Sequence, residues 1–393
     1  ADRMIENVVG TYSLPIGVAT NFLIDGKHYA IPFVVEEASV VAAASNMAKR
    51  CLLNGGFKSD NDDPVMIGQI QVVGLEDVEE AKKRVLSQKK SIIQMCNDVD
   101  PILVKFGGGC KDIEARPIKT ESGDMLIVHL LVDCRDAMGA NAVNTMAETV
   151  APKIEELTAG TVILRIISNL AVHRIARVSA TFTPEEMSNT GKDRIQGSEV
   201  INGVIQAYHF AAADPYRATT HNKGIMNAIS SVAIACGQDW RAIESGAHAY
   251  AAHGNENLRY GSMTEWSKDE NGNLRGTIRV PMAVGLVGGA IRIHPGAETN
   301  VALLGVETAD ELGSVMAAAG LAQNLGALRA LATVGIQAGH MKLHLQNMVA
   351  SAGAQGDEIQ KVSDMIKGSG ERITMAVVVE ALQKLRDQAP DES

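Results

Sequence analysis

The stretch from Val65 to Ile167 alternates between strand-like and helix-like patterns in an order that few folds accommodate. It predicts a strand over 65–75, an amphipathic helix over 77–97, strands over 112–119 and 125–134, a helix over 139–157 and a strand rich in β-branched residues over 161–167. The order β-α-β-β-α-β is that of the ferredoxin-like unit. We therefore predict a small ferredoxin-like domain over residues 64–171.

The segment before this unit is too short to build a large core of its own. It opens with a hairpin, because strand-like residues flank Asp25-Gly26, a strong two-residue turn signal, and a helix follows Glu36 and Glu37. After 172 the helical patterns lengthen, with a second hairpin at Asn271-Gly272. We predict an α+β protein in which 1–63 and 172–334 form one large, mainly helical domain, with the small domain inserted and a C-terminal helical tail over 335–393.

Composition excludes several classes of protein. The 393 residues include 46 acidic and 36 basic side chains, a net charge of −10, and only 4% aromatic residues. Both values disfavour nucleic-acid binding, which requires a basic face and stacking rings. The five cysteines form no CxxC pair, so neither a disulfide framework nor a structural zinc site is indicated. No uninterrupted apolar run reaches the ~18 residues of a membrane helix, so we expect a cytoplasmic protein without a membrane anchor.

Common catalytic signatures are missing from the chain. It has no GxGxxG dinucleotide fingerprint, no GxxxxGK[ST] phosphate loop, no GxSxG nucleophile elbow and no HExxH zinc helix. Any chemistry must therefore depend on a less common arrangement of residues.

The sequence DAMGAN at 136–141 is the first candidate site. A strand ends just before it and a helix follows, so free amides and the positive end of the helix dipole would meet at the turn. Such a turn suits a pyrophosphate, and small residues allow close approach. Alternatively, Gly139 only permits a tight turn.

Charged residues at predicted junctions form the second group of candidates. Lys223, expected at a helix start, could face an anion or a developing oxyanion, or could be solvated. Glu36 and Glu37 could cap a helix dipole, or one could point inward as a proton donor with a raised pKa. Asp239 could cap the next helix or orient Lys223.

Two histidines near the C-terminus, His340 and His344, have the i,i+4 spacing of metal ligands on a helix. No third ligand is evident, so we predict no metal site. A single histidine acting as a general acid is the simpler interpretation, and exposed histidines without a role are the alternative.

Several longer motifs together resemble 3-hydroxy-3-methylglutaryl-CoA (HMG-CoA) reductases of the soluble bacterial class II form. The motifs, which occur in the family's order and span the chain, are ENVVGTYSLPIG at 6–17, VVEE at 34–37, DAMGAN at 136–141, THNKGIMN at 220–227 and GHM at 339–341. The resemblance implies a large domain that binds the acyl-CoA, an inserted ferredoxin-like domain for the nicotinamide cofactor, a mobile C-terminal flap and a homodimer.

The resemblance also implies the reaction and its residues. Two hydride transfers interconvert HMG-CoA and mevalonate plus coenzyme A, through a hemithioacetal and mevaldehyde. The implied catalytic residues are Glu37, Lys223, Asp239 and His340, with His344 as a neighbour. The implied acyl-group ligands are Ser39, Arg217, Asn227 and Gln323.

The cofactor residues implied by the resemblance are Asp100, Asp136, Met138, Gly139, Asn141 and Asn169. Asp100 lies where NAD-using members carry an acid. A carboxylate accepts from the ribose 2′-OH and repels a 2′-phosphate, so we expect NAD rather than NADP. Asp98 and Lys105 are close enough in sequence to alter this preference.

Two other functions remain open on the sequence alone. One is a CoA-ester-binding protein without redox activity on the same fold. The other is an acyl-CoA transferase or thiolase-like enzyme, which would need an activated cysteine beside a histidine. Cys236 is the cysteine nearest to a candidate residue, but it lies in no evident motif.

Overall fold

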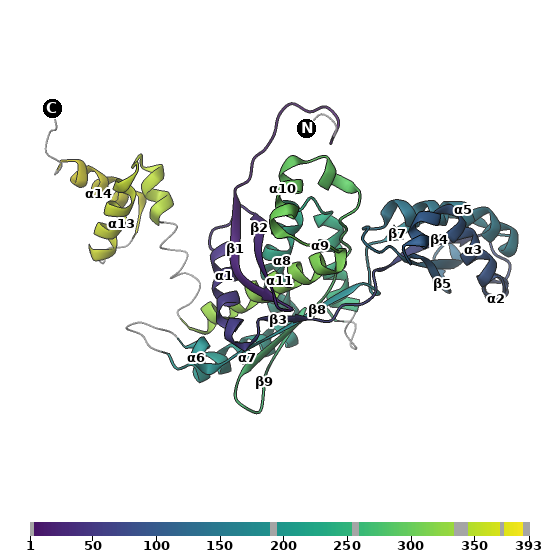
Figure 1. Ribbon diagram of the computed structural model, residues 1–393, viewed down its shortest axis with the longest axis horizontal. Coiled ribbons are helices and arrows are strands. Elements are labelled where there is room, and N and C mark those ends of the chain that lie inside the picture. The colour runs from purple at the N-terminus through teal and green to yellow at the C-terminus, as the bar shows by residue number, and fades with distance from the viewer. Residues whose placement is uncertain (1–3, 189–194, 254–258, 334–344, 370–372, 388–393) are drawn as a thin grey trace. The chain divides into compact units, whose positions relative to one another are not determined.

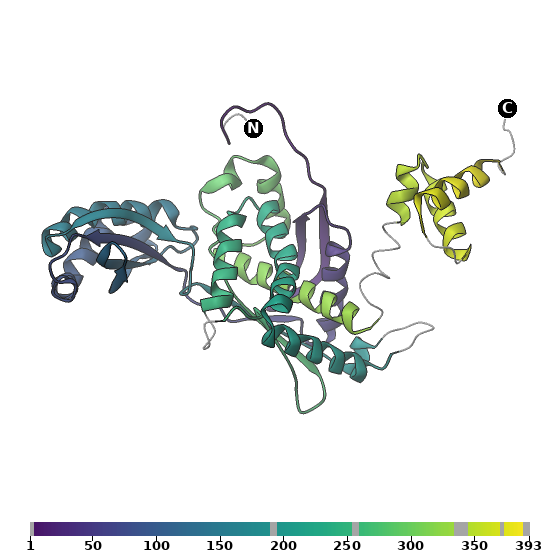
Figure 2. The ribbon, with the colours of Figure 1, turned by 180° about the vertical axis from the view of Figure 1, so that it is seen from behind.

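The computed structural model describes residues 4–188, 195–253, 259–333, 345–369 and 373–387 (Figures 1 and 2). They form two compact units. The first comprises Ala1–Glu36 and Val40–Arg329, and the second comprises Glu37–Ser39 and Ala330–Ser393. Helices and two sheets together confirm the predicted α+β class.

A four-stranded antiparallel sheet occupies the middle of the sequence. Its strands are β4 (Val65–Val73), β5 (Gly109–Thr120), β6 (Gly123–Asp133) and β7 (Thr161–Ser168), in the order β5-β6-β4-β7. Between β4 and β5 lie α2 (Val78–Ser87), α3 (Lys89–Val99) and α4 (Pro101–Lys105), and between β6 and β7 lies α5 (Ala140–Thr158). The elements therefore follow one another as β-α-β-β-α-β.

The long helix α5 packs tightly on this sheet. Its buried residues recur at helical spacing, from Val143 through Val150 to Ile154, and join the core beneath β4 and β6. A Cβ at Gly68 of β4 would lie 2.8 Å from the Val143 side chain, so glycine allows helix and strand to approach closely.

One local prediction in this region was wrong, and one short helix was missed. The single helix predicted over 77–97 is interrupted at Gln88, which separates α2 from α3. The short helix α4 was not predicted. It begins at Pro101, whose fixed φ suits the first helical position, and the Asp100 side chain caps it.

A six-stranded sheet joins segments from both sides of the four-stranded unit. Its strands are β1 (Ile16–Ile24), β2 (Lys27–Val34), β3 (Phe57–Ser59), β8 (Ile175–Phe182), β9 (Thr264–Lys268) and β10 (Leu274–Pro281), in the order β2-β1-β3-β8-β10-β9. Both predicted hairpins are confirmed, at Asp25-Gly26 and around Asn271-Gly272. The pairing of β3 with β8 crosses from residues before 64 to residues after 172.

The helices of this part are η1 (Leu52–Asn54), α1 (Val40–Cys51), α6 (Pro184–Met187), α7 (Gly197–Ala213), α8 (Pro215–Ala235), α9 (Trp240–His253), η2 (Gly289–Arg292), α10 (Pro295–Leu304) and α11 (Ala309–Ala332). The longest, α11, is buried along most of its length. By length and a mean hydropathy of 1.2 alone it would pass as a membrane helix. However, 67% of the most apolar part of this helix is buried inside the protein, as expected of a core helix.

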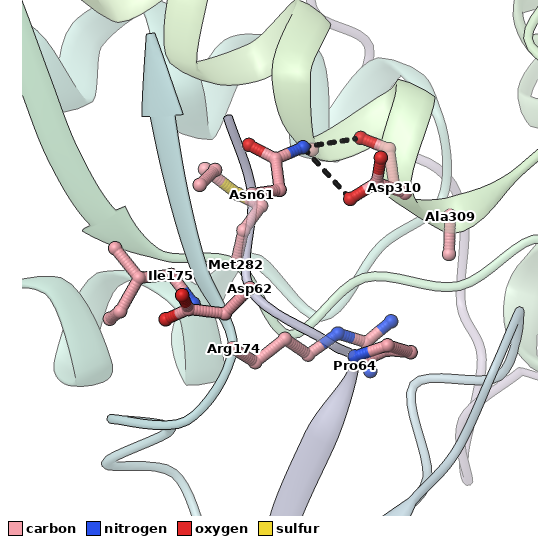
Figure 3. A pocket seen from close by; sticks show the side chains of 10 residues that line it. Asn61, Asp62, Pro64, Arg174, Ile175, Met282, Ala309 and Asp310 are labelled. Atoms are coloured by element: carbon pink, nitrogen blue, oxygen red, sulfur yellow. Dashed lines mark hydrogen bonds between the residues drawn. The ribbon is translucent and has the colours of Figure 1, made fainter. Parts of the chain in front are cut away.

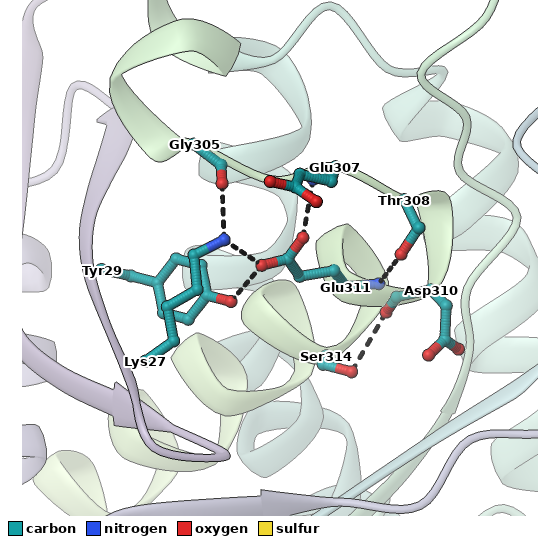
Figure 4. A network of polar contacts seen from close by, with 8 residues as sticks. All are labelled: Lys27, Tyr29, Gly305, Glu307, Thr308, Asp310, Glu311 and Ser314. Carbon is teal, nitrogen blue, oxygen red and sulfur yellow. Dashed lines mark hydrogen bonds and ion pairs between the residues drawn. The ribbon is translucent and has the colours of Figure 1, made fainter.

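A polar network fixes the start of α11 to the first hairpin (Figure 4). Glu311 pairs with Lys27 and accepts from the Tyr29 hydroxyl, and its other oxygen accepts from the Glu307 amide at 2.6 Å. Burial alone would raise the pKa of Glu311, but these hydrogen bonds outweigh burial and lower it. The ionised carboxylate therefore stabilises the fold.

The second unit contains α13 (Asp357–Ser369) and α14 (Met375–Asp387) around a small apolar core of its own. Arg386 of α14 donates to both carboxylate oxygens of Glu358 at 2.9 Å each. Hydrogen bonding to Arg386 lowers the pKa of Glu358 to about 2. This bidentate pair ties the two helices together.

Replacing Glu311 should expose how much the fold depends on its network. We expect Glu311→Gln to lower the free energy of unfolding at pH 7 by about 1–3 kcal/mol, because charged hydrogen bonds to Lys27 and Tyr29 are lost. The folded-state pKa of Glu311 is lowered, so its contribution is full above the unfolded value of 4.5 and is lost as the pH falls through the folded value. In urea titrations, the difference in free energy of unfolding between variant and wild type should be smaller at pH 3 than at pH 7.

The matched control is Glu80→Gln, which removes an exposed pair with Arg84 on α2. It should change stability within experimental error at both pH values. A Glu311→Gln effect no larger than this control would contradict the role of the network.

Candidate active site

Three predicted cofactor segments meet at one end of the four-stranded sheet. Gly109 at the start of β5 pairs with Asp133 at the end of β6, and Asp133 also faces Val65 at the start of β4. The end of β7 reaches the same edge, since Ser168 pairs with Ile67. The turn after β6 and Asn169, which directly follows β7, therefore lie at this end although they are far apart in sequence. The segment that carries Asp100 is linked to the start of β5, because Asn97 Oδ1 accepts from the Cys110 amide at 2.7 Å.

The turn from Arg135 to Gly139 has the geometry that the sequence suggested. Gly139 precedes the first residue of α5 with a φ of +107°, and a Cβ there would lie 2.4 Å from the Cys134 Sγ. Only glycine fits this position. The first amides of a helix have no partner within it, and no side chain caps α5 among the described residues. These amides suit an anion such as a pyrophosphate.

Asp136 in this turn is held by three contacts. Its Oδ1 accepts from the Ala309 amide at 2.8 Å and so caps the start of α11. Its carbonyl accepts from the amides of Leu286 and Val287 at 2.8 and 3.2 Å. One carboxylate oxygen of this predicted cofactor residue thus has a structural partner. Met138 is half-buried beside it and Asn141 is exposed.

The other two cofactor candidates differ in exposure. Asp100 is half-buried and caps α4, with its Oδ1 accepting from the Leu103 amide at 2.9 Å. Asn169 is exposed, and its carbonyl lies against Gly246 of α9, where a Cβ would approach it to 2.5 Å.

The structure connects the turn to the neighbour of Asp239, Gln238, through two hydrogen bonds between the Gln238 side-chain amide and the backbone of Gly285. Gln238 accepts from the Gly285 amide at 2.9 Å and donates to the Gly285 carbonyl at 3.0 Å. Gly285 in turn lies so close to Met138 that a Cβ would be 2.4 Å from its amide nitrogen. Asp239 itself caps α9 by accepting from the Ala242 amide at 3.1 Å, and it pairs with Arg241 at 3.4 Å.

Lys223 does not lie at a helix start, so that local prediction was wrong. Helix α8 begins eight residues earlier at Pro215, because Asp214 caps it by accepting from the Arg217 amide at 2.8 Å. Lys223 lies on an exposed face of α8, with Asn227 one turn further along the same face. Arg217 is half-buried in the first turn.

Gln323 on α11 is 7% exposed, and its Oε1 has no hydrogen-bond partner among the described residues. On the same helix, Gly320 faces Ile225 and Ile229 of α8, whereas Gly326 faces α1. Around the axis of α11, residue 323 lies between the side that packs on α8 and the side that packs on α1, so its side chain faces the space between these two helices. A buried acceptor without a donor is costly, and a bound hydroxyl would satisfy it.

A buried network that sequence reasoning missed holds α8 in place. His221 Nε2 lies 2.8 Å from the Thr264 hydroxyl, 2.9 Å from that of Ser262 and 3.1 Å from Asn324 Nδ2. Asn324 Oδ1 also accepts from the Trp266 indole at 2.8 Å. Burial, with a smaller effect of Arg217, lowers the pKa of His221 to about 3. A histidine two residues before Lys223 was the only available signal, and it does not reveal a network.

Glu37 and Ser39 lie between β2 and α1, and both are half-buried. Ser39 has a φ of +74°, a left-handed conformation that is strained for a non-glycine residue and that often marks a functional position. The helix after it begins only at Val40, so Glu36 and Glu37 are not in its first turn as predicted. His340 and His344 lie outside the described residues.

Comparisons with known proteins identify the family. A sequence model of hydroxymethylglutaryl-coenzyme A reductase matches residues 1–345. A 3-hydroxy-3-methylglutaryl-coenzyme A reductase of Archaeoglobus fulgidus is 57% identical over 98% of this chain and 86% of its own length. A probable reductase of the same name from Borreliella burgdorferi is 32% identical over 88% of this chain and 78% of its own.

Solved structures match the same family. An HMG-CoA reductase from Streptococcus pneumoniae superposes with a TM-score of 0.81 at 38% identity, covering 98% of this chain and 90% of that one. A class II enzyme from the same organism, bound to NADPH in open conformations, gives 0.80 at 39% identity, covering 98% and 91%. Together these matches show an oxidoreductase that uses a nicotinamide cofactor. The chain belongs to the hydroxymethylglutaryl-coenzyme A reductase family and to its class II type.

The buried histidine should make stability depend on pH in a specific way. Its pKa rises from about 3 in the folded protein to 6.5 on unfolding, so unfolding takes up a proton between these values. We expect His221 to remove about 1.4 kcal/mol of stability per pH unit as the pH falls from 6 to 4. In urea unfolding, the free energy of unfolding of His221→Gln should therefore decrease less steeply than that of wild type as the pH falls from 6 to 4.

His28→Gln, at an exposed position on β2, is the matched control and should leave the pH slope unchanged. A His221→Gln protein with the wild-type slope would show that this histidine is not buried in its neutral form.

Proposed function

We propose that the chain interconverts HMG-CoA and mevalonate plus coenzyme A with NAD as the cofactor, and that it acts as a cytoplasmic homodimer. The observation that carries this proposal is the turn of 135–139. There a glycine that no other residue can replace, the open start of α5 and the link to Asp239 meet at one end of the four-stranded sheet. Family membership supports the reaction.

Each part of the chain has a separate task in this proposal. Residues 1–63 and 172–334 form the domain that binds the acyl-CoA, and their shared six-stranded sheet supports this division. Residues 64–171 form the ferredoxin-like domain for the dinucleotide, and 335–393 form the flap. The negative net charge is in keeping with partners that are small molecules rather than nucleic acids.

The residues around the turn fit a nicotinamide dinucleotide. Free amides at the start of α5 and the missing Cβ at Gly139 leave room for its pyrophosphate, with Asp136, Met138, Asn141 and Asn169 as further contacts. When held by these residues, the dinucleotide would supply the hydride chemistry of both redox steps. The residues of the chain must then bind the acyl group, stabilise charge and transfer protons.

Four residues supply that chemistry in the proposal. The Lys223 ammonium would stabilise the negative charge that develops on the thioester carbonyl oxygen. His340 protonates the departing thiolate, and Glu37 protonates the aldehyde oxygen. Asp239 orients Lys223.

The acyl group would be held by Ser39, Arg217, Asn227 and Gln323. Arg217 suits the terminal carboxylate, since a guanidinium can pair with both oxygens. The unpartnered Oε1 of Gln323 suits the 3-hydroxyl group of the substrate.

Lys223 gives the direct test of this assignment. We expect Lys223→Met to reduce NAD-dependent oxidation of mevalonate with coenzyme A by about a hundredfold to a thousandfold, because one fixed charge at an oxyanion is worth roughly 3–4 kcal/mol. Coenzyme A binding should change little. Initial rates at the absorbance band of the reduced nicotinamide give the first quantity and calorimetry gives the second.

Lys90→Met, on an exposed face of α3, is the matched control and should retain wild-type rates. A Lys223→Met enzyme within about tenfold of wild type, a barrier change of only ~1.4 kcal/mol, would contradict the oxyanion role.

Cofactor preference should depend on Asp100. Because its side chain also caps α4, the suitable change is Asp100→Asn, which preserves the cap and removes the charge. We expect the ratio of kcat/KM for NAD over NADP to fall about tenfold, since a carboxylate no longer repels the 2′-phosphate.

Asp98→Asn is the matched control, two residues away and exposed, where Asp98 accepts only from Gln94 in the described contacts. If Asp98→Asn relaxes the preference while Asp100→Asn does not, the wrong acid has been assigned.

A further inference from the structure

Arg174 is a buried cation with no part in the reaction as described so far. Its side chain is 5% exposed and lies directly before β8, where the chain passes from the four-stranded sheet to the six-stranded one. A charged group at this depth needs hydrogen bonds that replace its hydration. Burial lowers the pKa of the guanidinium, yet arginine stays protonated in proteins.

The hydrogen bonds of Arg174 go to backbone carbonyls. Nη1 donates to the carbonyls of Ala137 at 3.0 Å and Met138 at 3.3 Å. Nη2 donates to those of Arg135 at 3.4 Å and Val284 at 2.6 Å. Three of the four acceptors belong to the turn after β6, and the fourth belongs to the segment after β10.

This arrangement determines which way the turn presents its amides. Carbonyl groups that converge on one cation leave the N–H groups of the same peptides directed away from it, as in an anion-binding nest. Two residues with positive φ make the convergence possible, Arg135 at +47° and Gly139 at +107°. For Arg135 this conformation is strained, so surrounding contacts such as the one from Arg174 must maintain it.

The charge of Arg174 is not cancelled by a direct ion pair in the described contacts. The carboxylates that act on it most strongly are those of Asp133, Asp136 and Asp310. Each is bound elsewhere: Asp133 pairs with Arg135, Asp136 caps α11, and Asp310 accepts from Asn61 at 2.8 Å. The direct hydrogen bonds of the guanidinium therefore go to backbone carbonyls, while these carboxylates stabilise its charge from a distance.

Figure 3 shows Arg174 beside Pro64, in the wall of a cavity that Asn61, Asp62 and Asp310 also line. The cavity measures about 20 Å³, room for about one water molecule. Arg174 thus lies where both connections between the two sheets pass, and its partners come from both sides of that crossing.

We propose that Arg174 is a positioning residue for hydride transfer. It holds the 135–139 turn and thereby directs the uncapped first amides of α5, which follow the turn, toward the pyrophosphate of the dinucleotide. Through Val284 it also fixes this turn to the part of the chain that binds the acyl group. The inference rests on the proposed function of the turn as the cofactor site. The sequence alone did not indicate this role of Arg174, because a single arginine before an apolar strand is not a distinctive pattern.

The test compares Arg174→Met and Arg174→Lys with the matched control Arg177→Met. Arg177 lies three residues further along, on β8, and pairs with Asp62 at 2.6 Å. We expect Arg174→Met to raise the KM for NAD at least tenfold and to lower kcat, with the KM values for mevalonate and coenzyme A within twofold of wild type. Arg174→Lys should recover part of the loss, because an ammonium keeps the charge but cannot span four carbonyls. Arg177→Met should keep wild-type values.

Each protein should also be titrated with NADH, followed by the fluorescence of the reduced nicotinamide. The dissociation constants for NADH should rank the variants in the same order as the KM values for NAD. Wild-type KM for NAD in both Arg174 variants, or equal increases in the KM of every substrate, would overturn the proposal. If Arg174→Met fails to fold, as thermal unfolding will show, Arg174→Lys alone decides, and a wild-type KM for NAD again overturns it. If wild type binds NADH but turns nothing over, the proposed function fails while the titrations still test Arg174.

Discussion

The structure depends on a constraint at the two connections between its sheets. The chain leaves the six-stranded sheet at Pro64 and returns before β8, and a single buried guanidinium lies at this crossing with acceptors on both sides. A cation without a bound carboxylate is costly to bury unless backbone carbonyls replace its water. The turn after β6 is therefore held in one conformation. The uncapped first amides of α5 follow it, at the sheet end where β7 also ends, just before Asn169.

A second set of contacts holds the helices that carry the acyl-group candidates. His221, Asn324 and Trp266 connect α8, α11 and β9 through buried hydrogen bonds. Because α8 is fixed from its buried side, Lys223 and Asn227 occupy defined positions on its exposed face. Such an arrangement suits a site that needs an immobile charge in front of a reacting carbonyl.

Much of the fold could be predicted from sequence because its signals are local. Asp-Gly and Asn-Gly turns specified both hairpins, and the periodicity of the middle segment specified its strands and α5. The break at Gln88 lies inside one continuous amphipathic pattern, which gives no local signal for it. The early start of α8 depends on capping by Asp214, which the apolar pattern does not reveal. The six-stranded sheet could not be foreseen, since β3 joins β8 across more than a hundred residues. Sequence context indicated some of the candidate site residues, such as the turn at 136–141 and Lys223, whereas their roles in the reaction came from the resemblance. The contacts of Arg174, Gln238 and His221 join residues that are far apart in sequence, so no local sequence pattern predicts them.

The most direct test of this account is the stoichiometry of nicotinamide reduction by the wild-type protein with limiting mevalonate, excess coenzyme A and NAD. Conversion of a primary alcohol to a thioester releases two hydrides, so the account predicts two equivalents of NADH per mevalonate consumed and no net reduction when coenzyme A is omitted. Reduction that proceeds without coenzyme A, or no reduction at all, would contradict it.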